Sequence, residues 1–486
     1  MKNFKSLIIN IFIISFFVLG IISCNSDKSN IAKNETIIIL HTNDMHAKID
    51  NFPKIASFVK EYKSKYKNVF LVSAGDLFSG NPYVDKYNDK GFPMIDLMNK
   101  VGYHVSTIGN HEFDYGQEIL NKRFKQAKFP FISANIKVET GKLIQPKASY
   151  TIKSKGGREI VFLGLTQTGY NNIPSTHPKK VVGLKFENFL EAVKQYNNLK
   201  KENNIFIGLT HLGKSSDIKL ANAFPQFDAI IGGHSHSYIE NGKKVNNVLV
   251  SQAGSNLNSI GIMTIKIKDG KIESITDKLK NIGRISDDIE IRTIVNKYKA
   301  NPILKKVIGS SKYGIEGNEN LGALMCDAII KHTEATIAFQ NEGGIRSNIP
   351  KGEIKIVDIY SLCPFGNDIV LFDMKYKDIK ELIQKSYKKG HIKADLKVSG
   401  IKYAIFTNKE GEFKEVKAFN INGTELSKDK TYKVALNSYT ASVIDFTKKD
   451  KGVAQGTTIA DAIINFITEK KVVDYRNINN TKIINE

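Results

Sequence analysis

The sequence predicts an α/β protein made of two regions joined by a connector. Between residues 36 and 285, short apolar β-rich runs alternate with helical stretches, which is typical of an α/β domain with buried strands. A charged helical segment, broken near Pro302, then covers 286–308. A second α/β region follows over 309–486 and begins with the helical stretch NLGALMCDAIIKHT. We therefore expect two regions, each with its own hydrophobic core.

Individual elements can be predicted within both regions. Candidate strands in the first region are the runs TIIILHTND, NVFLVSAGD, VSTIGNHEFD, FPFISANI, IVFLGLTQTG, IFIGLTHLG, AIIGGHSH and VLVSQAG. Helices are expected between them over 52–65, 92–101 and 186–201. The stretch IGIMTIKIKDGKIESI predicts a β-hairpin, because Asp269-Gly270 suits a tight turn. In the second region, ATIAFQNEGG predicts a strand and a turn, and TYKVALNSYT predicts a strand.

The amino-terminal residues 1–23 have the features of a secretory signal. Lys2 and Lys5 precede an uncharged apolar stretch over 7–22, which is shorter than the roughly 20 residues of a membrane-spanning helix. The Ser23-Cys24 junction resembles the lipobox of bacterial lipoproteins, in which Cys24 would be acylated. This predicts an exported protein, anchored to a bacterial membrane through Cys24 and a tether over 24–35, facing the periplasm or the cell exterior. The alternative is an uncleaved membrane anchor.

Charge and cysteine content exclude two other classes of protein. The formal charge is +22, but the lysines are scattered and form no basic arm, so no nucleic-acid partner is expected. A positive field would still favour an anionic substrate. Beyond Cys24, only Cys326 and Cys363 remain, both in apolar contexts. Two cysteines are no disulfide framework, so we expect buried free thiols.

Metal-ligating residue types follow five of the predicted strands. Open α/β sheets bind ligands at the carboxyl ends of their strands, so these side chains are expected to converge. The residues are Asp44 and His46 after the first strand, Asp76 after the second, Asn110, His111 and Asp114 in GNHEFD, His211 in THLG, and His234 and His236 in GGHSH. Any one of these motifs alone is more often a solvated turn, but the ordered set predicts a metal site.

The donor types indicate two divalent cations. Carboxylate, imidazole and amide oxygen suit Zn²⁺, Mn²⁺ or Fe, and the absence of cysteine argues against a structural zinc site. Two adjacent cations need a shared anion, for which Asp76 is the natural bridge. The remaining ligands divide into one set of Asp44, His46 and His236 and another of Asn110, His211 and His234. Such a pair of cations activates water and stabilises an in-line displacement.

His111 is left over beside this predicted centre. Paired with Asp114, it could stabilise charge on a phosphoryl oxygen or protonate a leaving group. His41 is expected to support the first ligand pair rather than bind metal. Surface or structural roles are expected for the histidines that lie outside these motifs: His104, His177, His332 and His391.

Together, the blocks DMH, GDLFSG, GNHEFD, THLG and GGHSH resemble the signature of the calcineurin-like metallophosphoesterases. The TND before His46 and the second region narrow the resemblance to the bacterial 5'-nucleotidase family. It extends from Thr36 to about residue 470. It implies a four-layer α/β/β/α catalytic sandwich over 36–285, a linker helix over 286–308, and an α/β substrate-binding domain over 309–486.

The resemblance also implies substrate contacts in the second region. NEGGIR would place Asn341 and Arg346 toward the substrate, with Arg346 on the phosphate. CPFGND and LNSYTASVIDF would supply two aromatic rings that sandwich the base, Phe365 and Tyr439, with Asn367 at the base edge and Asp445 at the ribose. The alternative for each ring is simple core filling. Two departures concern the substrate: Ile315, Gly317 and Asn318 stand where the family has arginine, and SVIDF replaces G-G-D-G-F.

These observations predict a dimetal phosphohydrolase that removes the 5'-phosphate from nucleotides. UDP-sugars and 2',3'-cyclic nucleotides are further candidate substrates. Two alternatives stay open: a dimetal hydrolase of a non-nucleotide ester, and a nucleotide-binding surface protein without activity. The oligomeric state cannot be predicted.

Overall fold

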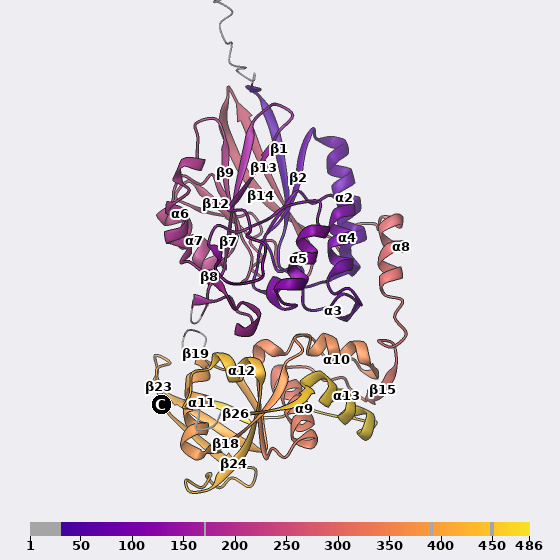
Figure 1. Cartoon of the computed structure of the whole chain (residues 1–486), viewed down its shortest axis with the longest axis vertical. Coiled ribbons are helices and arrows are strands. Elements are labelled where there is room, and N and C mark those ends of the chain that lie inside the picture. The colour runs from indigo at the N-terminus through magenta and orange to yellow at the C-terminus, as the bar shows by residue number, and fades with distance from the viewer. Residues whose placement is uncertain (1–30, 170–171, 389, 391, 448–451) are drawn as a thin grey trace, which may run out of the picture.

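The computed structural model describes residues 31–169, 172–388, 390, 392–447 and 452–486. Two α/β regions lie one above the other, connected by helix α8 (Ile289–Tyr298) at one side (Figure 1). The predicted signal segment and Cys24 lie outside the described residues. Within the described part of the chain, no helix is both long enough and apolar enough to span a bilayer.

The first region is built on two six-stranded sheets. One has the order β14-β13-β1-β2-β3-β4, with strands Lys271–Asn281, Ser259–Lys268, Glu35–Thr42, Asn68–Ser73, Val105–Thr107 and Phe131–Ile132. The other has the order β11-β12-β10-β9-β7-β6, with strands Lys243–Val245, Val248–Ser251, Ala229–Ile231, Ile205–His211, Glu159–Thr166 and Ser149–Lys153. In both sheets the central strands pair in parallel and at least one edge is antiparallel. Parallel strands therefore end together beside each other in each sheet.

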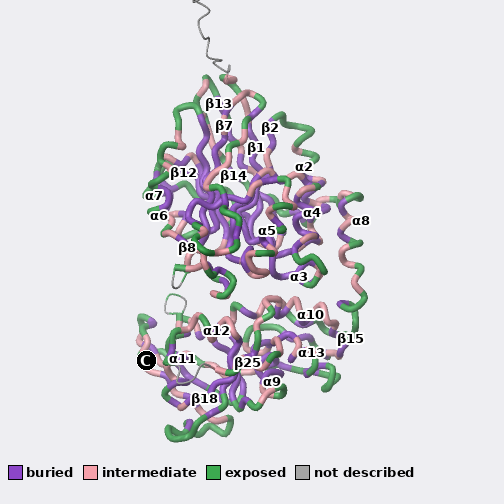
Figure 2. Tube along the Cα trace, in the orientation of Figure 1, coloured by how far each residue is buried: buried purple, intermediate pink, exposed green. Residues whose placement is uncertain are grey.

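Helices cover the outer faces of these sheets and complete four layers. Helices α2 (Phe52–Lys65), α4 (Phe92–Val101) and α5 (Gln117–Gln126) pack on the first sheet, and α6 (Phe189–Lys194) and α7 (Lys214–Ala223) pack on the second. The facing sides of the two sheets share one core, in which side chains such as Ile39 and Ile207 are fully buried. Figure 2 shows buried residues concentrated along the strands of this region. The predicted α/β/β/α sandwich is confirmed.

Most predicted elements of the first region are confirmed, and one is wrong. The helices over 52–65 and 92–101 have the predicted limits. The hairpin is also present, with positive φ at both Asp269 (50°) and Gly270 (81°), as a two-residue type I′ turn requires. The helix predicted over 186–201 is shorter: Asn188 caps it, it ends at Lys194, and Asn197–Leu199 form a 3₁₀ turn. Asparagine side chains favour caps and turns over helix interiors, and the periodicity argument ignored this.

The connector is attached to the first region. Asp288 caps α8 by accepting from the Ile291 amide, and the buried faces of Ile291 and Val295 pack against the first region. Tyr298 donates to Asp96 at 2.6 Å. The chain then leaves the helix near Lys299 and enters β15 (Val307–Ser311), so only part of 286–308 is helical.

The second region has a mixed five-stranded sheet at its centre. Its order is β21-β16-β24-β18-β25, with strands Leu396–Ser399, Ile337–Asn341, Thr431–Asn437, Asp368–Lys375 and Val453–Thr458. Helices α9 (Asn318–His332), α10 (Ile356–Leu362) and α13 (Ile459–Lys470) share one core with it. The second region also has a second core, which contains helix α11 (Tyr376–Ser386) and a three-stranded sheet. The order of this sheet is β23-β22-β26, with strands Phe413–Asn420, Ile401–Thr407 and Thr481–Asn485. Cys326 and Cys363 are buried free thiols, as predicted.

Shorter elements complete the two regions. They are α3 (Pro82–Asp85), β5 (Ile136–Val138), β8 (Leu184–Phe186), β17 (Gly352–Lys355), β19 (Tyr387–Lys388), β20 (Lys393–Ala394), α12 (Ser438–Val443), and the 3₁₀ helices Ile49–Asn51, His111–Phe113, Pro178–Lys180 and Glu342–Gly344.

Candidate metal centre and interdomain pocket

The carboxyl ends of β1, β2 and β3 in the first sheet meet those of β9 and β10 in the second. Six of the seven predicted metal ligands lie on the loops that follow these strands, and His211 is the last residue of β9. Three sets of donor atoms lie within 4.8 Å of one another: Asp44, His46 and His236; His46, Asp76 and His111; and Asp76, His211 and His234. Asp76 belongs to two of the sets. The predicted convergence at the carboxyl ends of strands is therefore present, and it occurs where those ends of two sheets meet.

The backbone at this junction is strained. Five of the seven predicted ligands have a left-handed backbone, a conformation that non-glycine residues rarely adopt. Their φ angles are 49° at Asp44, 45° at His46, 55° at Asp76, 77° at His234 and 51° at His236. Each such residue costs on the order of 1–3 kcal/mol, and such strain persists where surrounding structure enforces it, typically at functional sites.

Glycine and a buried carboxylate support the Asp76 loop. A Cβ atom on Gly109 would lie 2.2 Å from Asp76 Oδ1, so only glycine fits there. Glu112 is fully buried and accepts from the amides of Asp76 at 3.1 Å and Leu77 at 2.6 Å. Burial and the nearby Asp76 raise the pKa of Glu112 to about 7. This glutamate belongs to the GNHEFD motif, but its residue type and spacing predict no role for it.

His211 faces Asp76 in a manner that suits a cation between them. Its Nδ1–H donates to the Ala74 carbonyl at 2.7 Å, which directs Nε2 into the cluster. Nε2 lies 3.0 Å from Asp76 Oδ2, yet it is buried without a hydrogen-bond partner. Burial lowers the pKa of His211, but Asp76 and Asp44 outweigh it and raise that pKa to about 10. The carboxylates therefore create a demand for positive charge that a divalent cation would meet.

The other ligand set has the same character. His46 Nε2 lies 3.0 Å from His236 Nε2, and His236 Nε2 lies 3.3 Å from Asp44 Oδ1. Burial and the neighbouring His111 hold the pKa of His46 well below its ordinary value. A neutral imidazole is the form that binds a metal. The residues present therefore fit a pair of divalent cations.

His111 and Asp114 form the predicted pair beside this cluster. His111 Nδ1–H donates to Asp114 Oδ2 at 2.7 Å, and the His111 amide donates to Asp76 Oδ1 at 2.9 Å. Burial lowers the pKa of His111, but Asp76 and Asp114 reverse this and raise it above its ordinary value. The imidazole can therefore carry a positive charge next to the cluster.

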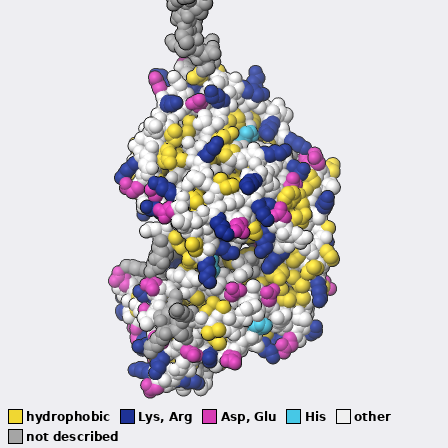
Figure 3. All heavy atoms as spheres, viewed as in Figure 1, with side chains coloured by type: hydrophobic (Ala, Val, Ile, Leu, Met, Phe, Trp, Pro, Cys, Tyr) yellow, Lys and Arg dark blue, Asp and Glu magenta, His cyan; other side chains and the backbone are white. Residues whose placement is uncertain are grey.

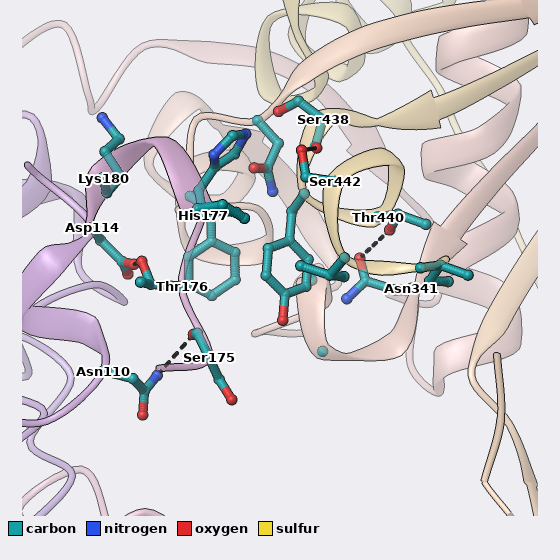
Figure 4. A pocket seen from close by; sticks show the side chains of 18 of the residues that line it. Asn110, Asp114, Ser175, Thr176, His177, Lys180, Asn341, Ser438, Thr440 and Ser442 are labelled. Atoms are coloured by element: carbon teal, nitrogen blue, oxygen red, sulfur yellow. Dashed lines mark hydrogen bonds between the residues drawn. The ribbon is translucent and has the colours of Figure 1, made fainter. Parts of the chain in front are cut away.

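A cavity of about 890 Å³ lies between the two regions and includes this centre. All six predicted substrate residues line it: Asn341, Arg346, Phe365, Asn367, Tyr439 and Asp445. Asp76, Asn110, His111, Asp114, His234 and His236 line it from the other side. Figure 4 shows Asn110 and Asp114 facing Asn341 and α12 across this space. On the face drawn in Figure 3, Lys and Arg side chains gather where the two regions meet, which would favour an anionic ligand.

Two side chains of the second region reach the first. The Phe365 ring stacks on His111, with centroids 5.5 Å apart and planes 12° from parallel. Arg346 Nη2 lies 3.5 Å from His46 Nε2, and the guanidinium carbon lies 5.7 Å from the centre of the Phe365 ring. A phosphate ester at the metal cluster would therefore lie within reach of a guanidinium group.

Sequence reasoning missed the loop that follows β7. Residues 173–180 line the cavity, and the Ser175 carbonyl accepts from Asn110 Nδ2 at 3.1 Å (Figure 4). His177, for which a surface or structural role was expected, lines this cavity as well. The only signal was the position of the loop at the carboxyl end of a central strand.

Several other residues that the sequence singled out lie away from the metal cluster. His41 is fully buried and pairs with Asp277 at 3.0 Å, so it links β1 to β14 within the sheet. His104 and His332 each make a hydrogen bond within their own region, and His391 lies outside the described residues. Ile315, the first of the positions without arginine, is fully buried in the second region's core rather than in the cavity.

Two family comparisons match these two regions. Residues 37–238 match the calcineurin-like phosphoesterases, whose members use a dimetal centre, and residues 305–447 match the 5'-nucleotidase C-terminal domain. In both of its regions, the chain is therefore similar to the 5'-nucleotidase family. The order of its two domains is that of the predicted architecture.

Individual relatives agree with this assignment. The trifunctional nucleotide phosphoesterase protein YfkN of Bacillus subtilis is 28% identical over 462 residues, covering 83% of this chain and 31% of YfkN. The chain thus spans about a third of that relative's length. The snake venom 5'-nucleotidase of Crotalus adamanteus is 26% identical, covering 84% of this chain and 81% of that protein. The crystal structure of the 5'-nucleotidase precursor from Thermus thermophilus has a TM-score of 0.81 at 25% identity, covering 93% of this chain and 100% of the other.

Proposed function

We propose that the protein is a dimetal phosphohydrolase that removes the 5'-phosphate from nucleotides. The observation that carries the proposal is one shared cavity. It contains a cluster of carboxylate and imidazole donors on one side and, on the other, a guanidinium group with two aromatic rings, Phe365 and Tyr439. Relatives with this pair of domains are 5'-nucleotidases and metallophosphoesterases, which hydrolyse phosphoric monoesters.

The metal ligands are assigned in two sets that share Asp76. Asp44, His46 and His236 complete one set, and Asn110, His211 and His234 complete the other. Two divalent cations, Zn²⁺, Mn²⁺ or Fe, held there would activate a water molecule and stabilise the entering and leaving oxygens of an in-line displacement.

The remaining side chains orient the substrate. Arg346 holds phosphoryl oxygens through its planar fork, and His111, oriented by Asp114, neutralises charge on the phosphoryl group or protonates the leaving oxygen. Phe365 and Tyr439 hold the base, with contacts to the base edge and ribose from Asn367 and Asp445. Asn341 lines the same cavity. Its Oδ1 accepts from Asn437 at 2.9 Å, which orients the amide.

We also propose that the protein is exported and anchored through acylated Cys24. The support is the basic, apolar and small-residue pattern of residues 1–23. Growth with radiolabelled palmitate should label the wild type, and Cys24→Ser should release an unlabelled protein into a soluble fraction. Labelling of the Cys24→Ser variant would contradict the anchor.

A phosphate-release panel tests the function. The purified protein with added Mn²⁺ or Zn²⁺ is assayed on nucleoside 5'-monophosphates, UDP-glucose, 2',3'-cyclic nucleotides and a simple aryl phosphate. Nucleoside monophosphates are expected to be the best substrates. Turnover confined to the aryl phosphate would favour a non-nucleotide ester. Nucleoside binding without turnover under any metal would favour a binding protein, and either result would overturn the proposal.

A further inference from the structure

Thr176 makes the second hydrogen bond to the carboxylate that orients His111. Its Oγ1–H donates to Asp114 Oδ1 at 2.9 Å, while Asp114 Oδ2 accepts from His111 Nδ1 at 2.7 Å. The two oxygens of one carboxylate are therefore used by two different partners. Figure 4 shows Thr176 beside Asp114, on the loop that crosses from the first region toward the second.

The hydroxyl is well placed to act as a fixed donor. Thr176 is only 3% exposed, and the loop around it is itself held in place. Gln167 accepts from the Ser175 amide at 3.0 Å and donates to Ser175 Oγ at 3.2 Å, while the Ser175 carbonyl accepts from Asn110 Nδ2 at 3.1 Å. This last bond turns the amide oxygen of Asn110 toward His234, whose Nδ1 lies 3.0 Å away.

We propose that Thr176 is a positioning residue for the reaction, which fixes the plane of Asp114 and through it the orientation of His111. A carboxylate bound at one oxygen can rotate about its terminal torsion, which is broad. A second bond at the other oxygen removes that freedom, and charge-assisted bonds of this kind are the strong ones. The adjacent Ser175 orients Asn110, so two successive residues of one loop align both the dyad and a candidate metal ligand.

This role is separate from lining the cavity. Residues 173–180 all line the cavity, but the Thr176 hydroxyl is directed at Asp114. Its loss should therefore lower kcat and leave KM for the nucleotide nearly unchanged, because the group acts on a side chain that assists bond cleavage. The inference rests on the proposed function, in which His111 contacts the reacting phosphoryl group or leaving oxygen.

Two matched variants separate positioning from simple packing. Thr176→Val keeps the shape and removes the donor, whereas Thr176→Ser keeps the donor and removes a methyl group. For AMP hydrolysis, Thr176→Val should lower kcat about tenfold, the order expected for one hydrogen bond to a charged acceptor, with KM within about twofold. The separate variant Thr176→Ser should keep kcat within about twofold of the wild-type value. Equal kcat for wild type and Thr176→Val would overturn the inference, as would a Thr176→Val variant that loses bound metal.

A second readout does not depend on turnover. The hydrogen-bonded Nδ1–H of His111 should give a downfield proton resonance, assigned by its absence in His111→Gln. It should persist in Thr176→Ser and exchange faster or disappear in Thr176→Val. An unchanged resonance in Thr176→Val would contradict the positioning role even if no nucleotide were a substrate. Failure of the proposed function would appear differently, as a wild type that keeps the resonance and turns over no nucleotide.

Discussion

The two sides of the interdomain cavity are built in different ways. On the metal side, five of the seven candidate ligands are at most 2% exposed, while His234 is partly buried and His236 is exposed. Five of the seven have positive φ. On the substrate side, Asn341 is buried, Arg346, Phe365, Asn367 and Tyr439 are only partly buried, and Asp445 is exposed. None of the six has a positive φ.

This difference indicates which side of the cavity must hold its side-chain atoms in fixed positions. Metal coordination depends on donor positions held within a fraction of an ångström, and strained, buried backbone can supply such positions. A base and a phosphate can be held by partly exposed side chains that adjust to the ligand. We therefore expect substitutions on the metal side to abolish chemistry and those on the substrate side to change selectivity.

The largest effect is expected at Asp76. Asp76→Asn should lower kcat/KM for AMP by roughly 10³-fold or more, because the shared negative charge supports several kcal/mol of transition-state stabilisation. Asp269→Asn is a matched control, since Asp269 also has positive φ (50° against 55° at Asp76) but lies in a hairpin turn. Phosphate release measures both variants. Comparable activity of Asp76→Asn and the control would break the comparison.

The second effect concerns stability on the metal side. Asp85 is buried beneath the loop beside the centre and accepts from the amides of Gly80 and Asn81, both at 2.9 Å. Burial raises the pKa of Asp85 from 3.8 to about 6. The folded state thus retains a proton that the unfolded state releases. Ionisation of Asp85 should therefore lower the free energy of unfolding by about 3 kcal/mol as pH rises from about 4 to above 6.

Asp85→Asn tests this cost, because the amide cannot ionise. The difference in unfolding free energy between the variant and the wild type should shift in favour of the variant between about pH 4 and pH 7. Urea denaturation at each pH measures it. A difference that is constant across this range would show that Asp85 titrates normally.

A smaller effect is expected at Arg346 on the substrate side. Arg346→Lys keeps the charge but loses the planar fork, so kcat/KM for AMP should fall roughly 30-fold. Arg476→Ala, which removes an exposed arginine that pairs with Asp474, serves as the control and should not change activity. Activity of Arg346→Lys equal to that of the wild type would leave Arg346 without a specific role in phosphate binding.

The smallest effect is expected at Phe365, and it sharpens the comparison. Loss of one stacking ring should raise KM for AMP about tenfold in Phe365→Ala and leave hydrolysis of 4-nitrophenyl phosphate within about twofold. Phe365 also stacks on His111. Equal losses with both substrates would therefore show that Phe365 acts through His111 rather than on a base.

The sequence predicted residues on both sides of the cavity. Strand-end motifs with distinctive residue types, such as GNHEFD and GGHSH, identified residues that converge in space. The same reasoning missed Glu112 and Thr176, because their roles lie in hydrogen bonds to the Asp76 loop and to Asp114, which no spacing reveals. Strain at positive φ was likewise invisible, since aspartate and histidine give no such signal in a sequence.

The helix predicted over 186–201 failed for a related reason. Its apolar spacing was helical, but local hydrogen bonds of the Asn188 side chain and a short turn at Asn197–Leu199 interrupt the helix. Longer periodic segments such as 52–65 were correct because packing on the sheet agrees with their local preference. Contacts between the two regions, such as that of Arg346 with His46, depend on their relative placement and could not be predicted.

The proposed metal centre requires Asp76 to serve two cations at once, and metal stoichiometry tests this directly. After saturation with Mn²⁺ or Zn²⁺ and removal of unbound ions, elemental analysis of the wild type should find two ions per chain. Asp76→Asn should retain one ion or none, while Asp269→Asn should retain two. A fully active wild type that holds a single ion, or an Asp76→Asn variant that holds two as tightly as the wild type, would contradict the shared-carboxylate centre.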